Sequence, residues 1–226
     1  ESTKTRILKK LLETDGYLSG QDLCEQLGVS RTAVWKYMKQ LKEEGYEIEA
    51  VQNKGYCLKD VPDVLGESEI KSRLHTRWAG QTLYYYDEID STNTQIKRLA
   101  EEDAPHGTLA VADYQSKGKG RRGHAWDSPH GSAIYMSILF RPDIRPDRAS
   151  MLTLVIGLSV AQAIRSNLGV QAQIKWPNDI VLNGKKLVGI LTEMSAQMNY
   201  IEYLVTGIGI NANLREFPEE LADKAT

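Results

Sequence analysis

Residues 113–131 read DYQSKGKGRRGHAWDSPHG, and they are the most informative stretch of this chain. Three glycines stand within six positions, among two lysines, two arginines and a histidine. Glycine allows backbone N–H groups to come close to a ligand, and lysine and arginine suit phosphate or carboxylate groups. The stretch is therefore either a basic surface loop or a clamp that binds an anion.

The same residues also satisfy the spacing G-x-G-x-x-G of dinucleotide-binding proteins, but their context excludes that kind of site. That fingerprint must open a helix. Residues 127–131 instead read DSPHG, a turn sequence that leads into a strand. Walker A spacing is absent as well, so an anion clamp here would be of another design.

Composition bounds the class of protein. The 226 residues are enough for one large or two modest domains, and the formal net charge of −2 gives no whole-chain argument for nucleic acid. No apolar run reaches membrane-spanning length, and the polar N-terminus is not a signal peptide, so we expect a cytoplasmic protein without a membrane partner. Cys24 and Cys57 form no C-x-x-C pair and lack histidine neighbours, which predicts neither a disulfide framework nor a zinc site.

Residues 1–60 predict three short helices followed by a β-hairpin. Apolar residues recur at helical spacing and glycines end each helix, while Ser19 and Ser30 are suited to cap the second and third helices. The third helix is expected over about 31–44, and Asn53-Lys54-Gly55 is expected to turn the hairpin.

This order of elements resembles a winged helix-turn-helix, in which the third helix enters the DNA major groove and the hairpin touches the backbone. The candidate DNA-facing residues lie at the start and along the exposed side of the third helix: Ser30, Arg31, Thr32, Lys36 and Lys39. Ten basic and ten acidic side chains balance in residues 1–60, so the pattern rather than net charge favours DNA binding. A winged helix used only for packing or dimerisation is the alternative.

Residues 61–66 are interpreted as a linker, and residues 67–226 as a second domain of mixed strands and helices. Helices are predicted over 67–74, 95–102 and 148–167. Strands are predicted over 82–88, 107–115, 132–140, 171–176, 180–182, 185–191 and 200–210. Such a mixture predicts an α+β domain.

Four polar sites accompany these elements. The run Ser91-Thr92-Asn93 precedes a helix, so it is either a helix cap or a polar ligand site. Asn178 follows Pro177 at a strand end, and Lys186 abuts an apolar run and could point into a pocket. The strand 200–210 ends GIGINAN, where glycines again permit a ligand to approach.

Together these motifs, in this order behind a winged helix, resemble the bifunctional biotin protein ligases that also act as repressors. The motifs that carry the resemblance are Ser91-Thr92-Asn93, Gln115 with 118–126, 175–179, 186–191 and 207–211. The resemblance implies an N-terminal winged helix-turn-helix followed by a mixed-sheet catalytic domain of the class II biotin/lipoate ligase type.

The resemblance also implies a two-step reaction. The carboxylate of biotin attacks the α-phosphate of ATP, assisted by Mg²⁺, to give biotinyl-5′-adenylate and pyrophosphate. A lysine of a carboxyl-carrier domain then attacks the mixed anhydride. The adenylate would further promote a homodimer that binds operator DNA.

By the same resemblance, two cations carry the chemistry, Arg121 and Lys186. The residues implied for biotin are Ser91, Thr92, Asn93, Gln115, Gly118, Lys119, Gly120, Arg121, Lys186, Gly189 and Gly209. The residues implied for ATP are Arg121, Arg122, Trp126, Asn178 and Asn211.

Two departures from the family pattern bear on activity. The common loop is Gly-Arg-Gly-Arg-Arg-Gly-Arg, and Lys119 and His124 replace its first and last arginines here. The family usually ends in an SH3-like β-domain, whereas this chain stops in what is predicted to be a helix over 218–225. A lipoate or octanoate ligase, and a ligand-sensing regulator with an inactive ligase domain, are the alternatives.

Overall fold

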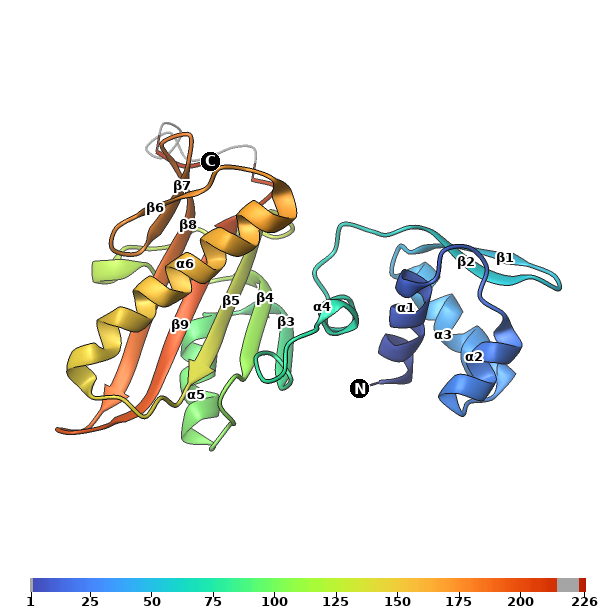
Figure 1. The fold of residues 1–226 in the computed structure, drawn as a ribbon, viewed down its shortest axis with the longest axis horizontal. Coiled ribbons are helices and arrows are strands. Elements are labelled where there is room, and N and C mark those ends of the chain that lie inside the picture. Colours follow the sequence, from blue (N-terminus) through green and yellow to red (C-terminus); the bar gives the residue numbers. More distant parts are fainter. Residues whose placement is uncertain (1, 215–223) are drawn as a thin grey trace. The chain divides into compact units, whose positions relative to one another are not determined.

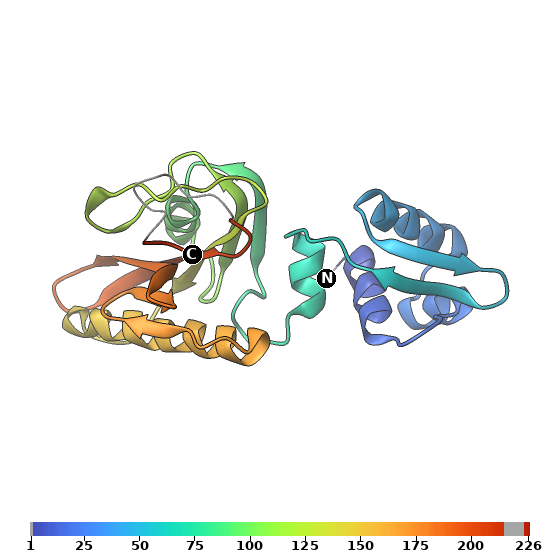
Figure 2. The same ribbon diagram turned by 90° about the horizontal axis from the view of Figure 1, so that it is seen from above.

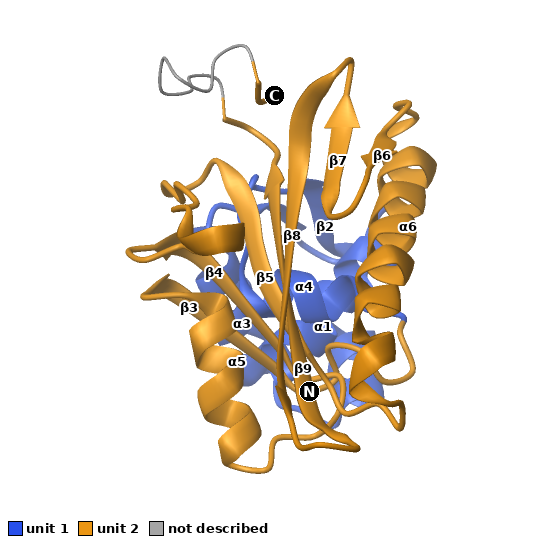
Figure 3. Ribbon diagram, turned by 90° about the vertical axis from the view of Figure 1, so that its left-hand side faces the viewer, with its two compact units in different colours: residues 1–75 blue, residues 76–226 orange. Residues whose placement is uncertain are grey.

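The computed structural model describes residues 2–214 and 224–226, and it divides the chain into two compact units. Unit 1 comprises residues 1–75 and unit 2 residues 76–226 (Figure 3). Each has its own buried apolar core.

Unit 1 begins with the three expected helices, α1 (Thr3–Glu13), α2 (Gly20–Leu27) and α3 (Arg31–Glu43). Serine hydroxyls cap all three, at Ser2, Ser19 and Ser30, by accepting backbone N–H groups of the first turn. The apolar faces of the helices meet in one core that includes Ile7, Leu23, Val34, Met38 and Leu41. Helix boundaries and core were thus accessible from capping and periodicity alone.

The hairpin consists of β1 (Glu47–Val51) and β2 (Gly55–Asp60), paired antiparallel. Leu18 joins it as a bridge to Tyr56. Gly55 has φ +109°, and a Cβ there would lie 2.1 Å from the carbonyl oxygen of Leu18. Only glycine therefore permits this turn to pack against the helices, and the predicted winged-helix arrangement is confirmed.

The division between the units lies later than expected. Helix α4 (Glu67–Arg73) packs on α1 and belongs to unit 1, so the second unit starts at Thr76 rather than at residue 67. The hydroxyl of Tyr46 donates to Oε2 of buried Glu69 at 2.6 Å, and Arg73 contacts the other carboxylate oxygen. Linker composition could not reveal this, because the contact joins residues on either side of the predicted 61–66 linker.

Unit 2 contains a seven-stranded mixed sheet with the order β3-β4-β5-β9-β8-β7-β6 (Figure 1). The strands are β3 (Leu83–Ile89), β4 (Leu109–Gln115), β5 (Ala133–Phe140), β6 (Gln173–Lys175), β7 (Asp179–Leu182), β8 (Lys185–Ala196) and β9 (Ile201–Asn211). Strands β3 and β4 are parallel and joined through helix α5 (Thr92–Glu101), whereas all other neighbours are antiparallel. The predicted α+β class is confirmed.

Two helices cover opposite faces of this sheet (Figure 2). Helix α6 (Ala149–Leu168) packs Ile156 and Ile164 against a cluster that contains Ile190 and Ile208. Helix α5 packs against Leu139 and Val205. Successive residues of a strand point to opposite faces, so odd-numbered positions of β9 face α5.

Helix α6 departs in one respect from the predicted core helix, because Val155 is 56% exposed. The segment 146–168 is long and apolar enough to cross a membrane, by length and composition alone. Its inner face nevertheless packs on the sheet. Of the helix predicted over 218–225, residues 218–223 lie outside the described residues. Ala225 is not helical but forms a parallel bridge to Lys186.

Candidate functional site

A small pocket, with a cavity volume of about 50 Å³, opens in unit 2 at the first turn of α5. Its lining includes twelve of the residues singled out in the sequence: Ser91, Thr92, Asn93, Gln115, Lys119, Gly120, Arg121, Trp126, Asn178, Lys186, Gly189 and Gly209. Five separate segments supply them. Three further candidates lie outside this lining, namely Gly118, Arg122 and Asn211.

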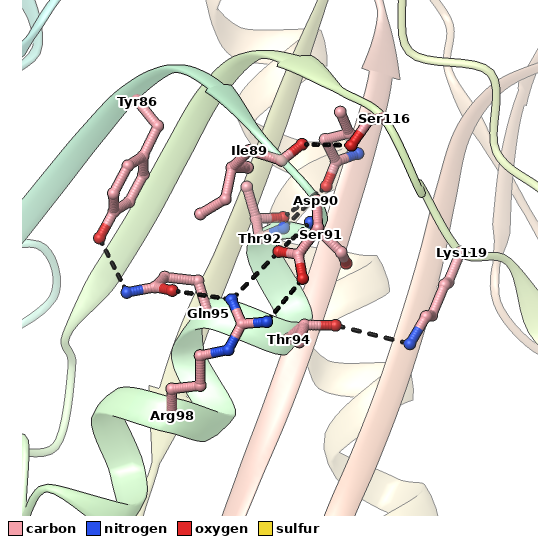
Figure 4. A network of polar contacts seen from close by, with 11 residues as sticks. Tyr86, Ile89, Asp90, Ser91, Thr92, Thr94, Gln95, Arg98, Ser116 and Lys119 are labelled. Atoms are coloured by element: carbon pink, nitrogen blue, oxygen red, sulfur yellow. Dashed lines mark hydrogen bonds and ion pairs between the residues drawn. The ribbon is translucent and has the colours of Figure 1, made fainter.

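The N-terminus of α5 forms one wall of the pocket. Ser91 is the N-cap residue, but its side chain makes no capping hydrogen bond, so of the two alternatives for Ser91 the one in which it only caps the helix is wrong. Oε1 of Gln115, at the end of β4, accepts a hydrogen bond from the backbone N–H of Thr92 at 2.8 Å and lies 3.1 Å from the Thr92 hydroxyl. Figure 4 shows this strand-to-helix junction, where Arg98 also clamps Asp90. A helix N-terminus with free polar groups suits a polar or anionic ligand.

The basic loop folds back on itself as a short hairpin over the pocket. The backbone N–H of Trp126 donates to the carbonyl of Gly118 at 2.9 Å, and the backbone N–H of Gly120 donates to the carbonyl of His124 at 2.8 Å. A Cβ on Gly118 would lie 2.2 Å from the Trp126 oxygen, so Gly118 serves loop closure. The tip is a single 3₁₀ turn, and the next strand is β5, which confirms that no dinucleotide-type helix follows.

Three cations approach the pocket rim. Arg121 donates to the amide oxygen of Asn178 at 2.8 Å, and the ammonium of Lys186 lies 2.8 Å from a carboxylate oxygen of Asp179. Lys119 extends toward Thr94, with 3.5 Å between Nζ and Oγ1 (Figure 4). Two positive groups on the loop, Arg121 and Lys119, and Lys186 on β8 thus surround a space that would suit anionic groups.

The indole of Trp126 lies on a pair of glycines in the middle of the sheet. Gly189 and Gly209 are directly opposite each other on β8 and β9. A Cβ on either would lie 2.5–2.6 Å from the indole ring. The ammonium of Lys186 is 5.2 Å from the ring centroid, and Nε1 of the indole is buried without a partner among the described residues. The ring therefore covers the platform that the sequence had assigned to biotin.

Besides Gly118, which closes the loop, two candidates lie outside the lining, and they differ in their contacts. Arg122 is exposed in the turn, with φ +57°. Asn211 donates to the carbonyl oxygen of Lys186 at 3.4 Å and so supports that residue from behind.

Two residues of this region, Ser137 and Glu193, were missed by the sequence analysis, and both contact pocket residues from behind. Their signals were weak, since Ser137 is one hydroxyl within an apolar strand and Glu193 follows an apolar run. Gly207, which the sequence analysis named only as part of the motif 207–211, lines the pocket.

In unit 1, the five DNA-facing candidates all lie on the exposed side of α3 and its cap. The Ser30 hydroxyl accepts the N–H of Ala33 at 3.2 Å, and Arg31 donates to Gln21 at 2.7 Å. Trp35 is 60% exposed on the same helix, although the sequence analysis had not counted it among the candidates.

Comparisons with known proteins agree with this geometry. Residues 85–211 match the biotin/lipoate A/B protein ligase family, and residues 3–57 match an HTH domain. The chain is 48% identical to the bifunctional ligase/repressor BirA of Bacillus spizizenii, over all of this chain and 70% of that protein. It is 34% identical to the BirA of Escherichia coli, over 95% of this chain and 65% of that protein.

Among solved structures, the biotin protein ligase of Aquifex aeolicus in complex with biotin and ATP matches with a TM-score of 0.55 and 40% identity. The match covers 65% of this chain and 59% of the Aquifex chain. It therefore concerns a part of each protein.

Proposed function

The chain belongs to the biotin/lipoate protein ligase family, among its bifunctional ligase/repressors, and we propose that its pocket joins biotin to ATP and passes the biotinyl group to a carrier protein. The observation that carries the proposal is the convergence of Arg121, Lys119 and Lys186 on a pocket with a polar wall and a glycine floor. Biotin has a polar ureido ring, an apolar body and a carboxylate, and each part has a matching surface there.

We assign the ureido ring to the wall formed by Ser91, Thr92, Asn93 and Gln115, which offers hydroxyl, amide and backbone groups. The flat ring system would lie on Gly189 and Gly209, where no side chain stands between ligand and sheet. Since the indole of Trp126 covers that platform, biotin binding requires the indole to leave it. A displaced indole would then be available to stack on the adenine, as expected for Trp126.

The chemical step joins two anions, so the site must neutralise both and hold them in line. A carboxylate oxygen of biotin attacks the α-phosphorus, and the bond from that phosphorus to the leaving pyrophosphate breaks. Lys186 would exchange its contact with Asp179 for the reacting oxygens, while Arg121 would bind the α-phosphate. Lys119, Gly120 and the backbone at Gly118 would wrap the adenylate and keep water out.

Arg122 and Asn211 are proposed to serve the nucleotide at the edge of this site, beside Asn178. Mg²⁺ bound to the phosphates would supply further positive charge, and it prefers oxygen ligands of the kind that Asn178 and Asp179 offer. The described residues contain no group of three His, Cys, Asp or Glu able to hold a metal without the nucleotide.

In the second step, the neutral amine of a carrier lysine would attack the acyl carbon and release AMP. No side-chain nucleophile is needed, because the incoming amine performs the displacement. We therefore propose a carboxyl-carrier domain as the protein substrate, and the cytoplasm, where carrier and DNA are both present, as the place of action.

The repressor function rests on unit 1, where we propose that the α3 face contacts operator DNA through Arg31, Thr32, Lys36 and Lys39. Lys36→Ala should weaken operator binding several-fold and reduce the slope of log K against log salt by about 1. Fluorescence anisotropy over a salt series measures both, and an unchanged slope contradicts the phosphate contact.

We further propose a homodimer that uses the edge of the sheet. Strand β7 pairs with β8 only as far as Gly189, so Leu191–Ala196 has no strand on that side among the described residues. Such an edge presents free N–H and C=O groups to a second copy. Sedimentation with biotin and ATP tests this, and a monomer under all conditions contradicts it.

Pyrophosphate exchange into ATP tests the ligase proposal directly, with biotin and with lipoate as the acid. Exchange that depends on biotin is the expected result. Exchange with lipoate alone would assign the chain to the lipoate ligases, and no exchange with either acid would leave unit 2 as a regulatory domain.

A further inference from the structure

Behind the polar wall of the pocket runs a chain of hydrogen bonds whose central residues, Thr92, Asn93 and Ser137, are buried. At its centre, the amide of Asn93 donates through Nδ2 to Glu193 at 2.8 Å and to the carbonyl of Leu191 at 3.3 Å. On the other side, Oγ of Ser137 lies 2.6 Å from Oδ1 of Asn93 and 2.7 Å from the hydroxyl of Thr92. From Thr92 the chain continues through the backbone N–H, which donates to Oε1 of Gln115 at 2.8 Å.

Each link of this chain fixes the orientation of the next. A carboxylate can only accept hydrogen bonds, so Glu193 turns the amide nitrogen of Asn93 toward itself and the amide oxygen toward Ser137. Because that oxygen can only accept, the hydroxyl proton of Ser137 points to it, and the contact between Ser137 and Thr92 is made by the hydroxyl proton of Thr92. Both amide hydrogens of Asn93 are thus committed within the protein, which makes this side chain a support for the first turn of α5.

Glu193 is itself held in place. Lys97 donates to its Oε1 at 2.6 Å while Asn93 occupies Oε2, so the two carboxylate oxygens have separate partners. Burial alone would raise the pKa of Glu193, but the hydrogen bonds from Lys97 and Asn93 hold it below the usual range. Glu193 is therefore ionised near neutral pH.

The sheet is shaped to admit this chain. Ser137 is completely buried. A Cβ on Gly207 would lie 2.2 Å from Oδ1 of Asn93, so the backbone of β9 leaves the space that the amide needs. This chain of hydrogen bonds is therefore suited to hold the polar groups of the pocket wall in the one orientation that a ligand needs.

We propose that Glu193 and Ser137 are positioning residues for the acid substrate: through Asn93 they set the orientation of Thr92 and Gln115, and thereby favour a ureido head group. This inference rests on the proposed function. It assigns specificity for the head group to residues that line no part of the pocket.

The first test is Glu193→Gln, measured by pyrophosphate exchange. Glutamine offers one acceptor oxygen, for which Lys97 and Asn93 compete, so the amide of Asn93 loses its fixed orientation. We expect KM for biotin to rise about 10-fold to 100-fold, as for a lost buried hydrogen bond. The KM for ATP should change less than about threefold, because the ATP-side residues Arg121 and Asn178 lie apart from this chain. Ser137→Ala should act in the same direction.

The decisive variant is the double substitution Lys97→Met with Glu193→Gln. Removing Lys97 frees the glutamine oxygen for Asn93, so KM for biotin should return to within about threefold of the wild type. A merely structural role predicts the opposite, since the double variant lacks the ion pair and should be worse than either single change. Melting temperatures measured in parallel separate an effect on KM for biotin from an effect on stability.

Thr192→Val is the matched control. Thr192 precedes Glu193 on β8 and points to the α6 face, where its hydroxyl lies 2.8 Å from that of Thr153. It should lower stability without changing KM for biotin. An unchanged KM in Glu193→Gln, or no recovery in the double variant, overturns the inference. Absence of biotin-dependent exchange in the wild type would instead overturn the proposed function.

Discussion

The two functional surfaces of this protein are built in different ways. The proposed DNA face of unit 1 lies on one helix and its cap, whereas the pocket of unit 2 is assembled from five segments between Ser91 and Gly209. A surface on one helix inherits its geometry from local rules of capping and periodicity. A pocket made by several strands depends on register, so one substitution at its floor or rim should affect several contacts at once.

The largest effect is expected for Lys186→Ala. This change removes a cation at the rim and leaves Asp179 without its positively charged partner beside the anionic reactants. Pyrophosphate exchange should fall about 100-fold to 1000-fold, the range for loss of one electrostatic stabiliser. Lys185→Ala, on the opposite face of the same strand, is the control and should stay within about threefold. Equal losses in both variants would contradict the role of Lys186.

Gly209→Ala tests the floor of the pocket. The added Cβ would lie 2.6 Å from the indole of Trp126 and would occupy the surface proposed for biotin. We expect the affinity for biotin, measured by calorimetry, to fall about tenfold or more, by overpacking.

Gly157→Ala is the matched control, since its Cβ would meet only Ile190 at 3.8 Å on the other face of the sheet. This change inside α6 should not weaken biotin binding and should raise stability slightly. Retained affinity in Gly209→Ala would show that biotin does not lie on the glycine pair.

Ser30 tests the single-helix surface, because its hydroxyl already accepts the N–H of Ala33. Ser30→Ala should destabilise unit 1 by about 1 kcal/mol, the usual cost of a lost cap. Ser30→Asp should keep that stability but weaken operator binding, because it places a negative charge beside phosphate. Thermal unfolding and anisotropy measure the two effects, and equal DNA binding by both variants would exclude Ser30 from the interface.

The smallest expected effect is a loss of stability of unit 2 at acid pH. Arg98 holds the pKa of Asp90 below its usual range, and Glu193 is likewise lowered by Lys97 and Asn93 despite its burial. Groups with lowered folded pKa values stabilise the fold above their unfolded values, about 4, and lose that contribution as pH falls toward the folded values. Below about pH 4, the melting temperature of unit 2 should therefore fall by a few degrees. Glu193→Gln should flatten this dependence, and an unaltered profile would contradict the assignment.

Much of unit 1 could be predicted because its signals are local. Ser19 and Ser30 act as caps, Gly28 ends α2 in a left-handed conformation, and the apolar stripe of α3 faces the core. The exception is α4, whose attachment depends on the pair Tyr46 and Glu69. A hydrogen bond between residues 23 positions apart leaves no periodic trace.

In unit 2, the motifs named most of the pocket lining, since Ser91, Gln115, Lys186 and Gly209 stand in recognisable short patterns. Sequence alone could not say that Trp126 covers Gly189 and Gly209, or that Ser91 leaves its cap role unused. Both depend on the loop lying over a particular register of β8 and β9.

The sequence was sufficient for the winged helix, the α+β class and the residue types of the pocket, because caps, glycines and charged motifs act over a few positions. The support formed by Glu193, Ser137 and Gly207 emerged only from the folded sheet. Pairing of β5, β9 and β8 brings these distant residues to one face beside α5. Hydrogen bonding between strands is what gives three otherwise ordinary residues a common place in the molecule.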